Sequence, residues 1–159
     1  MKPGEWLAER PLLYAVSHQL IVIPLVAFLF FVSHPGSVMV APVWGLTLVS
    51  LGGFFAYEVG RKLDPAAHPV IRTYRQVYGL GGSFVLTVAA VFAALAGAAL
   101  MGASVVVAPV AAALLVTFAM LLVRPDRHAG VELAASVNLL VCLWSGVFQD
   151  LLSKFGIMH

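Results

Sequence analysis

Residues 80–101, LGGSFVLTVAAVFAALAGAALM, form an apolar stretch without a single charged side chain. A bilayer core about 30 Å thick is crossed by a helix of roughly 20 such residues. Strands of a transmembrane barrel are apolar only at alternate positions, which excludes that architecture. Four further apolar stretches have a similar length, at about 12–32, 38–57, 104–123 and 131–152. The sequence therefore predicts an all-α polytopic membrane protein with five transmembrane helices in a single membrane domain, residues 1–159.

The composition of the whole chain supports the same class. Of the 159 residues, 62% are hydrophobic and 10% are charged, and the mean hydropathy is +1.01. Soluble domains have about 45–50% apolar and about 25% charged residues. The values exclude an ordinary soluble enzyme and a disordered chain. The single cysteine, Cys142, excludes a disulfide-rich module, and a net charge of +2 gives no reason to expect a nucleic-acid partner.

Small residues and prolines have distinct places in these apolar stretches. Alanine and glycine are concentrated between residues 89 and 99, which permits close approach of a neighbouring helix. Pro24, Pro42 and Pro109 lie inside predicted spans, where packing against other helices can satisfy the carbonyls that they free. The small residues predict tight helix packing and indicate no particular chemistry.

The basic residues are distributed unequally between the two sides of a five-span topology. One side has eight of the nine cations: Lys2, Arg10, Arg61, Lys62, Arg72, Arg75, Arg124 and Arg127. The other side has only Lys154. Cytoplasmic loops of membrane proteins are enriched in lysine and arginine. We therefore expect an integral protein of a bacterial inner membrane with a cytoplasmic N-terminus and loop 60–76, and with the C-terminus outside.

The densest polar segment lies where the second span meets that loop, in the sequence YEVGRKLDP of residues 57–65. Glu58, Arg61 and Lys62 have the i, i+3 and i+4 spacing of one helical face. Asp64 precedes a proline and is expected to end the helix. Two carboxylates can hold a hard divalent cation that bridges phosphate oxygens, and arginines can neutralise the remaining charge.

This pattern has two interpretations. In the first, the segment binds a diphosphate, with Arg61, Lys62, Arg72, Tyr74 and Arg75 at the phosphates and Glu58 and Asp64 at Mg²⁺. In the second, the cations fix the topology and contact anionic lipid headgroups, while Glu58 forms a salt bridge within its own helix.

Several of these residues match a known family. Residues 54–62, FFAYEVGRK, followed by Thr73, Tyr74, Tyr78 and Gly79, resemble the second acidic-motif loop of UbiA-type prenyltransferases, in the branch with Glu-x-x-Arg-Lys. Residues 12–19, LLYAVSHQ, with Pro24 and Leu25, resemble the start of the second half of that branch. The resemblance implies a nine-helix fold of which this chain matches helices five to nine. It also implies Mg²⁺-dependent ionisation of an isoprenyl diphosphate.

Two departures from the family pattern determine the functional expectation. The first acidic motif has no counterpart, and Lys62 stands four residues after Glu58 where the pattern has a second acid. The resemblance therefore implies a half-length protein that binds an isoprenoid or lipid diphosphate and transfers prenyl groups only with a second membrane polypeptide or as a homodimer. The alternative is a non-catalytic structural or lipid- or pigment-binding subunit of a larger membrane complex.

Among the polar residues inside predicted spans, where polar side chains are candidates for function, we single out three. His18 and Gln19 are in the first span, close to its cytoplasmic end, and serve either a ligand or a hydrogen bond between helices. Asn138 is in the fifth span and is expected to serve helix packing.

Overall fold

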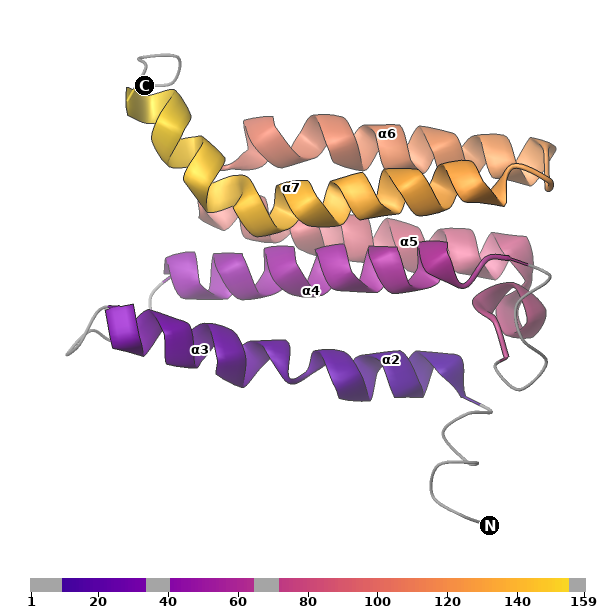
Figure 1. The fold of residues 1–159 in the computed structure, drawn as a ribbon, viewed down its shortest axis with the longest axis horizontal. Coiled ribbons are helices and arrows are strands. Elements are labelled where there is room, and N and C mark those ends of the chain that lie inside the picture. Colours follow the sequence, from indigo (N-terminus) through magenta and orange to yellow (C-terminus); the bar gives the residue numbers. More distant parts are fainter. Residues whose placement is uncertain (1–9, 34–40, 65–71, 155–159) are drawn as a thin grey trace, which may run out of the picture.

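The computed structural model describes residues 10–33, 41–64 and 72–154, and every regular element in these ranges is a helix. The helices are α2 (Pro11–Gln19), α3 (Val22–Ser33), α4 (Ala41–Arg61), α5 (Tyr74–Leu100), α6 (Ser104–Val123) and α7 (His128–Lys154). They lie side by side in one bundle (Figure 1). Five segments are long and apolar enough to cross a membrane, the first of them formed by α2 and α3 together. The prediction of an all-α membrane protein with five transmembrane helices is confirmed.

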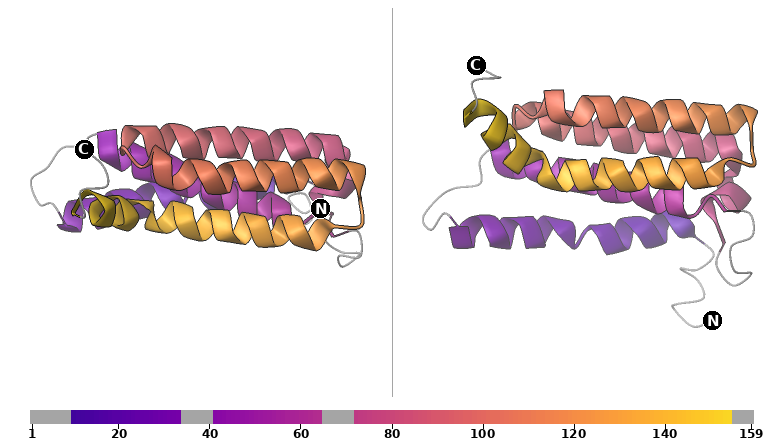
Figure 2. Two further views of the ribbon diagram at one scale, coloured as in Figure 1. Left: turned by 90° about the horizontal axis from the view of Figure 1, so that it is seen from above. Right: turned by 45° about the horizontal axis from the view of Figure 1, so that its top comes forward.

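Helix α4 is the centre of the bundle. It packs against α2 and α3 on one side and against α5 and α7 on the other, and α6 covers α5 and α7. Figures 1 and 2 show the first span, α2 and α3, along one edge of the bundle. In the apolar part of this span only 17% of the residues are buried, compared with 56% in that of α4. The first span is therefore the peripheral helix of the fold.

The two ends of the bundle differ in charge. The start of α2, the end of α4, the start of α5 and the α6–α7 turn lie at one end (Figure 1). This end, which we call the cationic end, has all but one of the basic residues that the structure describes: Arg10, Arg61, Lys62, Arg72, Arg75, Arg124 and Arg127. Lys154 closes α7 at the opposite end, and Lys2 lies outside the described residues. That the cationic end faces the cytoplasm stays a prediction.

The first span has the predicted extent but is not one continuous helix. Helix α2 ends at Gln19 and α3 begins at Val22. Pro24 lacks an N–H group, and its ring would clash with the carbonyl four residues earlier, at Leu20. That carbonyl instead accepts a hydrogen bond of 3.2 Å from Ile23. The proline therefore explains a break in the middle of the span.

The segment between the second and third spans also differs in detail from the expected loop 60–76. Helix α5 already begins at Tyr74, because Thr73 and Gln76 form a reciprocal capping box. Gly79, with φ of +67° and ψ of 179°, then interrupts the helix before the long apolar part. Residues 65–71 lie outside the described ranges. The short first turn of α5 is thus set at an angle to the rest of the helix.

Small residues bring α4 and α5 into backbone contact. A Cβ atom added to Gly52 would lie 2.5 Å from the carbonyl oxygen of Ala90, and one added to Gly97 would lie 2.5 Å from that of Gly45. Gly60 has a similar place against α7, where a Cβ would lie 2.8 Å from that of Ala135. In membranes such close approach provides the van der Waals packing that holds helices together.

The buried face of α7 contains a polar side chain without a partner. Asn138 is fully buried, and among the described residues neither its Nδ2 nor its Oδ1 has a hydrogen-bond partner. The structure thus places this residue inside the bundle, and its expected role in helix packing stays a prediction. An unpaired buried amide costs roughly 1–3 kcal/mol of stability.

Replacing Asn138 with leucine, which has the same branched arrangement of side-chain heavy atoms but no polar atom, is therefore expected to increase the free energy of unfolding by about 1 kcal/mol. Thermal unfolding of the purified protein in detergent measures the change. Ser136→Ala on the same helix is the matched control, because Ser136 is more exposed and bonds only to the carbonyl of Glu132. A lower melting temperature for Asn138→Leu than for the control would contradict the expectation.

Candidate functional site

The polar residues at the end of α4 form one ion-pair cluster. Glu58 Oε2 lies 3.0 Å from Arg61 Nη2, and Glu58 Oε1 lies 2.5 Å from Lys62 Nζ. The expected common face of these three residues is confirmed. The Arg61 side chain is 50% exposed, whereas that of Lys62 is 12% exposed. Arg61 is therefore the cation of this cluster that a ligand can reach.

Lys62 is enclosed by aromatic rings from two other helices. Its Nζ lies 5.0 Å from the centre of the Tyr14 ring and 6.0 Å from that of Tyr74, within the range of cation–π attraction. The buried hydroxyl of Tyr74 donates a hydrogen bond of 3.1 Å to the carbonyl of Pro11. Tyr74 and Lys62 thus connect α2, α4 and α5 at the cationic end.

The other charged residues of the predicted site contact the α6–α7 turn or solvent. Asp64 Oδ1 lies 3.7 Å from His128 Nε2, and Arg75 Nη1 donates to the carbonyl of Pro125 at 3.2 Å. Arg72 is exposed. Glu58 and Asp64, the two carboxylates expected to hold Mg²⁺, therefore have different partners. In the described ranges no three histidine, cysteine or acidic side chains are grouped so as to hold a metal ion.

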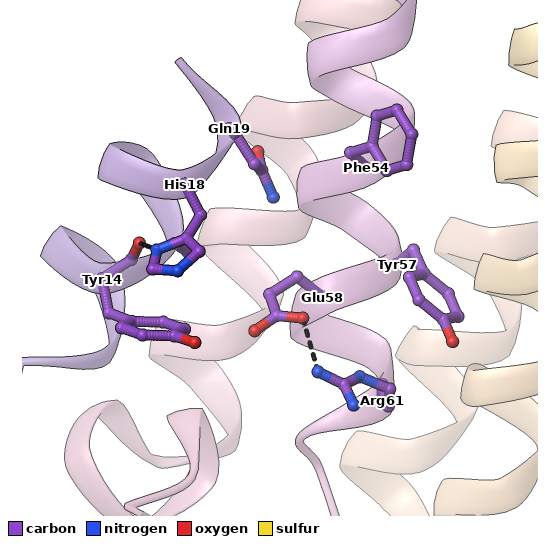
Figure 3. Close-up of a pocket in the computed structure, with 8 residues that line it drawn as sticks. Tyr14, His18, Gln19, Phe54, Tyr57, Glu58 and Arg61 are labelled. Atoms are coloured by element: carbon purple, nitrogen blue, oxygen red, sulfur yellow. Dashed lines mark hydrogen bonds and ion pairs between the residues drawn. The ribbon is translucent and has the colours of Figure 1, made fainter. Parts of the chain in front are cut away.

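A pocket of about 280 Å³ lies between α2 and α4 beside this cluster, and we call it the polar pocket because charged and polar residues are among those that line it. Figure 3 shows Glu58 and Gln19 directed into the space between the two helices, with His18 beside them. The imidazole Nδ1 of His18 lies 3.1 Å from the carbonyl of Tyr14, and the two rings lie 4.1 Å apart between centres and are tilted by 33°. The residues that line the pocket are Tyr14, Ala15, His18, Gln19, Phe54, Tyr57, Glu58 and Arg61.

An apolar groove of about 370 Å³ follows, between α2, α4 and α5. Its walls are Val16 and Gln19 of α2 with Leu20 directly after that helix, Leu48, Leu51, Gly52 and Phe55 of α4, and Leu86, Ala89, Ala90 and Ala93 of α5. Gln19 lines both the polar pocket and the groove. His18 and Gln19, two of the polar residues that the sequence indicated as candidates, line the polar pocket together with Glu58 and Arg61.

The groove residues were not foreseen as a site, because they are apolar residues of three spans that come together only in the folded bundle. The crowding of alanine in residues 89–99 was the one available signal, and it indicated packing. The site as a whole has a charged part at the end of the bundle and an apolar part inside it. That division matches the two parts of an amphiphile.

Comparison with known proteins identifies no relative, so a functional assignment depends on the geometry described above. No protein-family model matches the chain, and no curated protein or solved structure is significantly similar to it.

Proposed function

We propose that the protein binds a membrane amphiphile, an isoprenoid or lipid with a phosphate or diphosphate headgroup. The headgroup occupies the polar pocket at Arg61, and the hydrocarbon chain lies in the apolar groove. The observation on which this rests is the position of Gln19, which lines both spaces and so marks where they meet. Ligand sites of this kind are typically about 300–1,000 Å³ and largely apolar with a few polar groups.

Arg61 has the chemistry to recognise the headgroup. Its planar guanidinium donates paired hydrogen bonds to phosphate, and it is half-exposed beside the pocket. A phosphate would replace Glu58 as the partner of Arg61. Because Mg²⁺ is commonly held by one or two carboxylates together with substrate phosphates, Glu58 is then the residue to share such an ion. The metal ion would neutralise phosphate charge.

Prenyl transfer is the catalytic form of this proposal, with a second membrane polypeptide or a second copy of the chain providing what this chain lacks. The UbiA-like residues around Glu58 favour it. The competing proposal is a non-catalytic lipid- or pigment-binding subunit of a larger complex. It is favoured by the existing ion pairs, since Glu58 is neutralised by Arg61 and Lys62, and Asp64 lies near His128.

Arg61→Gln is expected to weaken binding of farnesyl diphosphate about tenfold or more, because charged hydrogen bonds contribute about 1.5–3 kcal/mol. Binding of farnesol, which lacks the phosphates, should change little. Native mass spectrometry of the purified protein, with and without Mg²⁺, measures both ligands. The matched control is Arg124→Gln, since Arg124 is exposed in the α6–α7 turn and does not line the pocket.

Equal affinity of wild type and Arg61→Gln for farnesyl diphosphate would contradict the assignment of Arg61. Catalysis is tested separately, by prenyl transfer in membranes that contain this protein and its copurifying partner. Glu58→Gln should abolish transfer if the protein is catalytic. Unchanged transfer in that variant would contradict the catalytic proposal and support the non-catalytic one.

A further inference from the structure

The order of residues along the apolar groove follows from the helix directions. Helix α4 runs toward the cationic end, and α5 runs away from it. Packing of Gly52 against Ala90 and of Gly97 against Gly45 fixes the register of the two antiparallel helices. Phe55 and Leu86 are therefore the groove residues of α4 and α5 nearest the polar pocket. Leu48 and Ala93 are the furthest from it.

The α5 wall of the groove consists mostly of alanine. Three of its four residues are alanines, at positions 89, 90 and 93. Ala93 is partly exposed at the far end, so a larger side chain there has room to extend into the groove. Ala96, one turn further, is exposed and does not line the groove. The length of the groove thus depends on how small residue 93 is.

We propose that Ala93 determines the length of the hydrocarbon chain that the groove accepts. This inference rests on the proposed function and makes the residue a specificity determinant of the same site. The hydrocarbon chain of the ligand gains little free energy by moving from the bilayer into the groove, because both surroundings are apolar. Selection by length therefore comes from packing, and a side chain at the far end excludes the terminal part of a long chain.

The test compares Ala93→Phe with Ala96→Phe, which places the same side chain on the same helix but outside the groove. Phe92 is 66% exposed on this part of α5, so the surface of this helix already accommodates an exposed phenylalanine. The ligands are geranyl, farnesyl and geranylgeranyl diphosphate, in competition, measured by native mass spectrometry. Ala93→Phe is expected to lower affinity for the longest chain about tenfold relative to the shortest, since overpacking costs about 1–3 kcal/mol. Ala96→Phe should leave the ratio unchanged.

The two levels of the proposal fail in different ways. If Ala93→Phe lowers affinity for all three ligands equally, or for none, Ala93 does not set chain length, although the amphiphile site stands. If wild-type protein binds none of the three, the proposed function and this inference both fail. Ala93→Leu is the second variant, for use if the phenylalanine variant does not fold. It should shift the ratio in the same direction by a smaller factor.

Discussion

Replacing Gly97 with alanine is expected to destabilise the bundle by about 2–3 kcal/mol, a large effect for one methyl group. The new Cβ would lie 2.5 Å from the carbonyl oxygen of Gly45 and 2.6 Å from the backbone nitrogen of Val49. Both contacts are backbone atoms, so no flexible side chain can move to relieve them. Helices α4 and α5 must separate, and the packing along the whole pair is weakened.

Gly81→Ala on the same helix is the control for this substitution. A Cβ at Gly81 meets no atom within 4 Å, and alanine favours a helix over glycine by up to about 1 kcal/mol. The two variants should therefore change thermal stability in opposite directions when unfolding is measured in the same detergent. Similar melting temperatures for the two variants would show that α4 and α5 do not pack as closely as described.

Truncating Tyr74 to alanine is the second large effect, an expected loss of about 3 kcal/mol. The side chain is fully buried, its ring contacts that of Phe55 at 6.5 Å between centres, and its hydroxyl bonds to Pro11. The truncation would leave a cavity where α2, α4 and α5 meet and would also remove one ring that faces Lys62. The first span, already the least buried, would lose its hydrogen bond to α5 at the cationic end.

Two further variants separate the parts of this effect. Tyr74→Phe removes only the hydroxyl and should cost about 1 kcal/mol. Tyr78→Ala removes a tyrosine of the same helical turn that is 37% exposed, and it should cost less than Tyr74→Ala. Equal losses for Tyr74→Ala and Tyr78→Ala would mean that Tyr74 does not hold the first span in place.

Much of the fold could be predicted from the sequence, because the bilayer imposes a simple rule. Uncharged runs of about 20 residues require helical spans, and the breakers at Gly102 and Pro125 separate α5 from α6 and α6 from α7. The Glu58, Arg61 and Lys62 cluster was also predictable. Its i, i+3 and i+4 spacing is a local property of one helix, and no tertiary information is needed to place the three side chains together.

Features that depend on contacts between distant segments could not be predicted. The hydroxyl of Tyr74 bonds to a carbonyl 63 residues earlier, whereas the expectation for this residue was a phosphate-binding role. The groove combines single residues from three spans, none of them distinctive alone. Pro24 explains the break at Leu20–Ile21. The break could not be predicted from the proline alone, because neighbouring helices decide whether a proline within a membrane span bends or interrupts its helix.

The most direct test of the amphiphile site is photo-crosslinking with a farnesyl diphosphate analogue whose reactive group is at the end of the chain. The protein in lipid nanodiscs is irradiated with the analogue, and the labelled positions are found by mass spectrometry. The predicted result is labelling of the groove residues Leu48, Leu51, Ala89 and Ala93, reduced by excess farnesyl diphosphate. Labelling confined to exposed residues of α6, such as Val105, Val116 and Met120, would contradict the site.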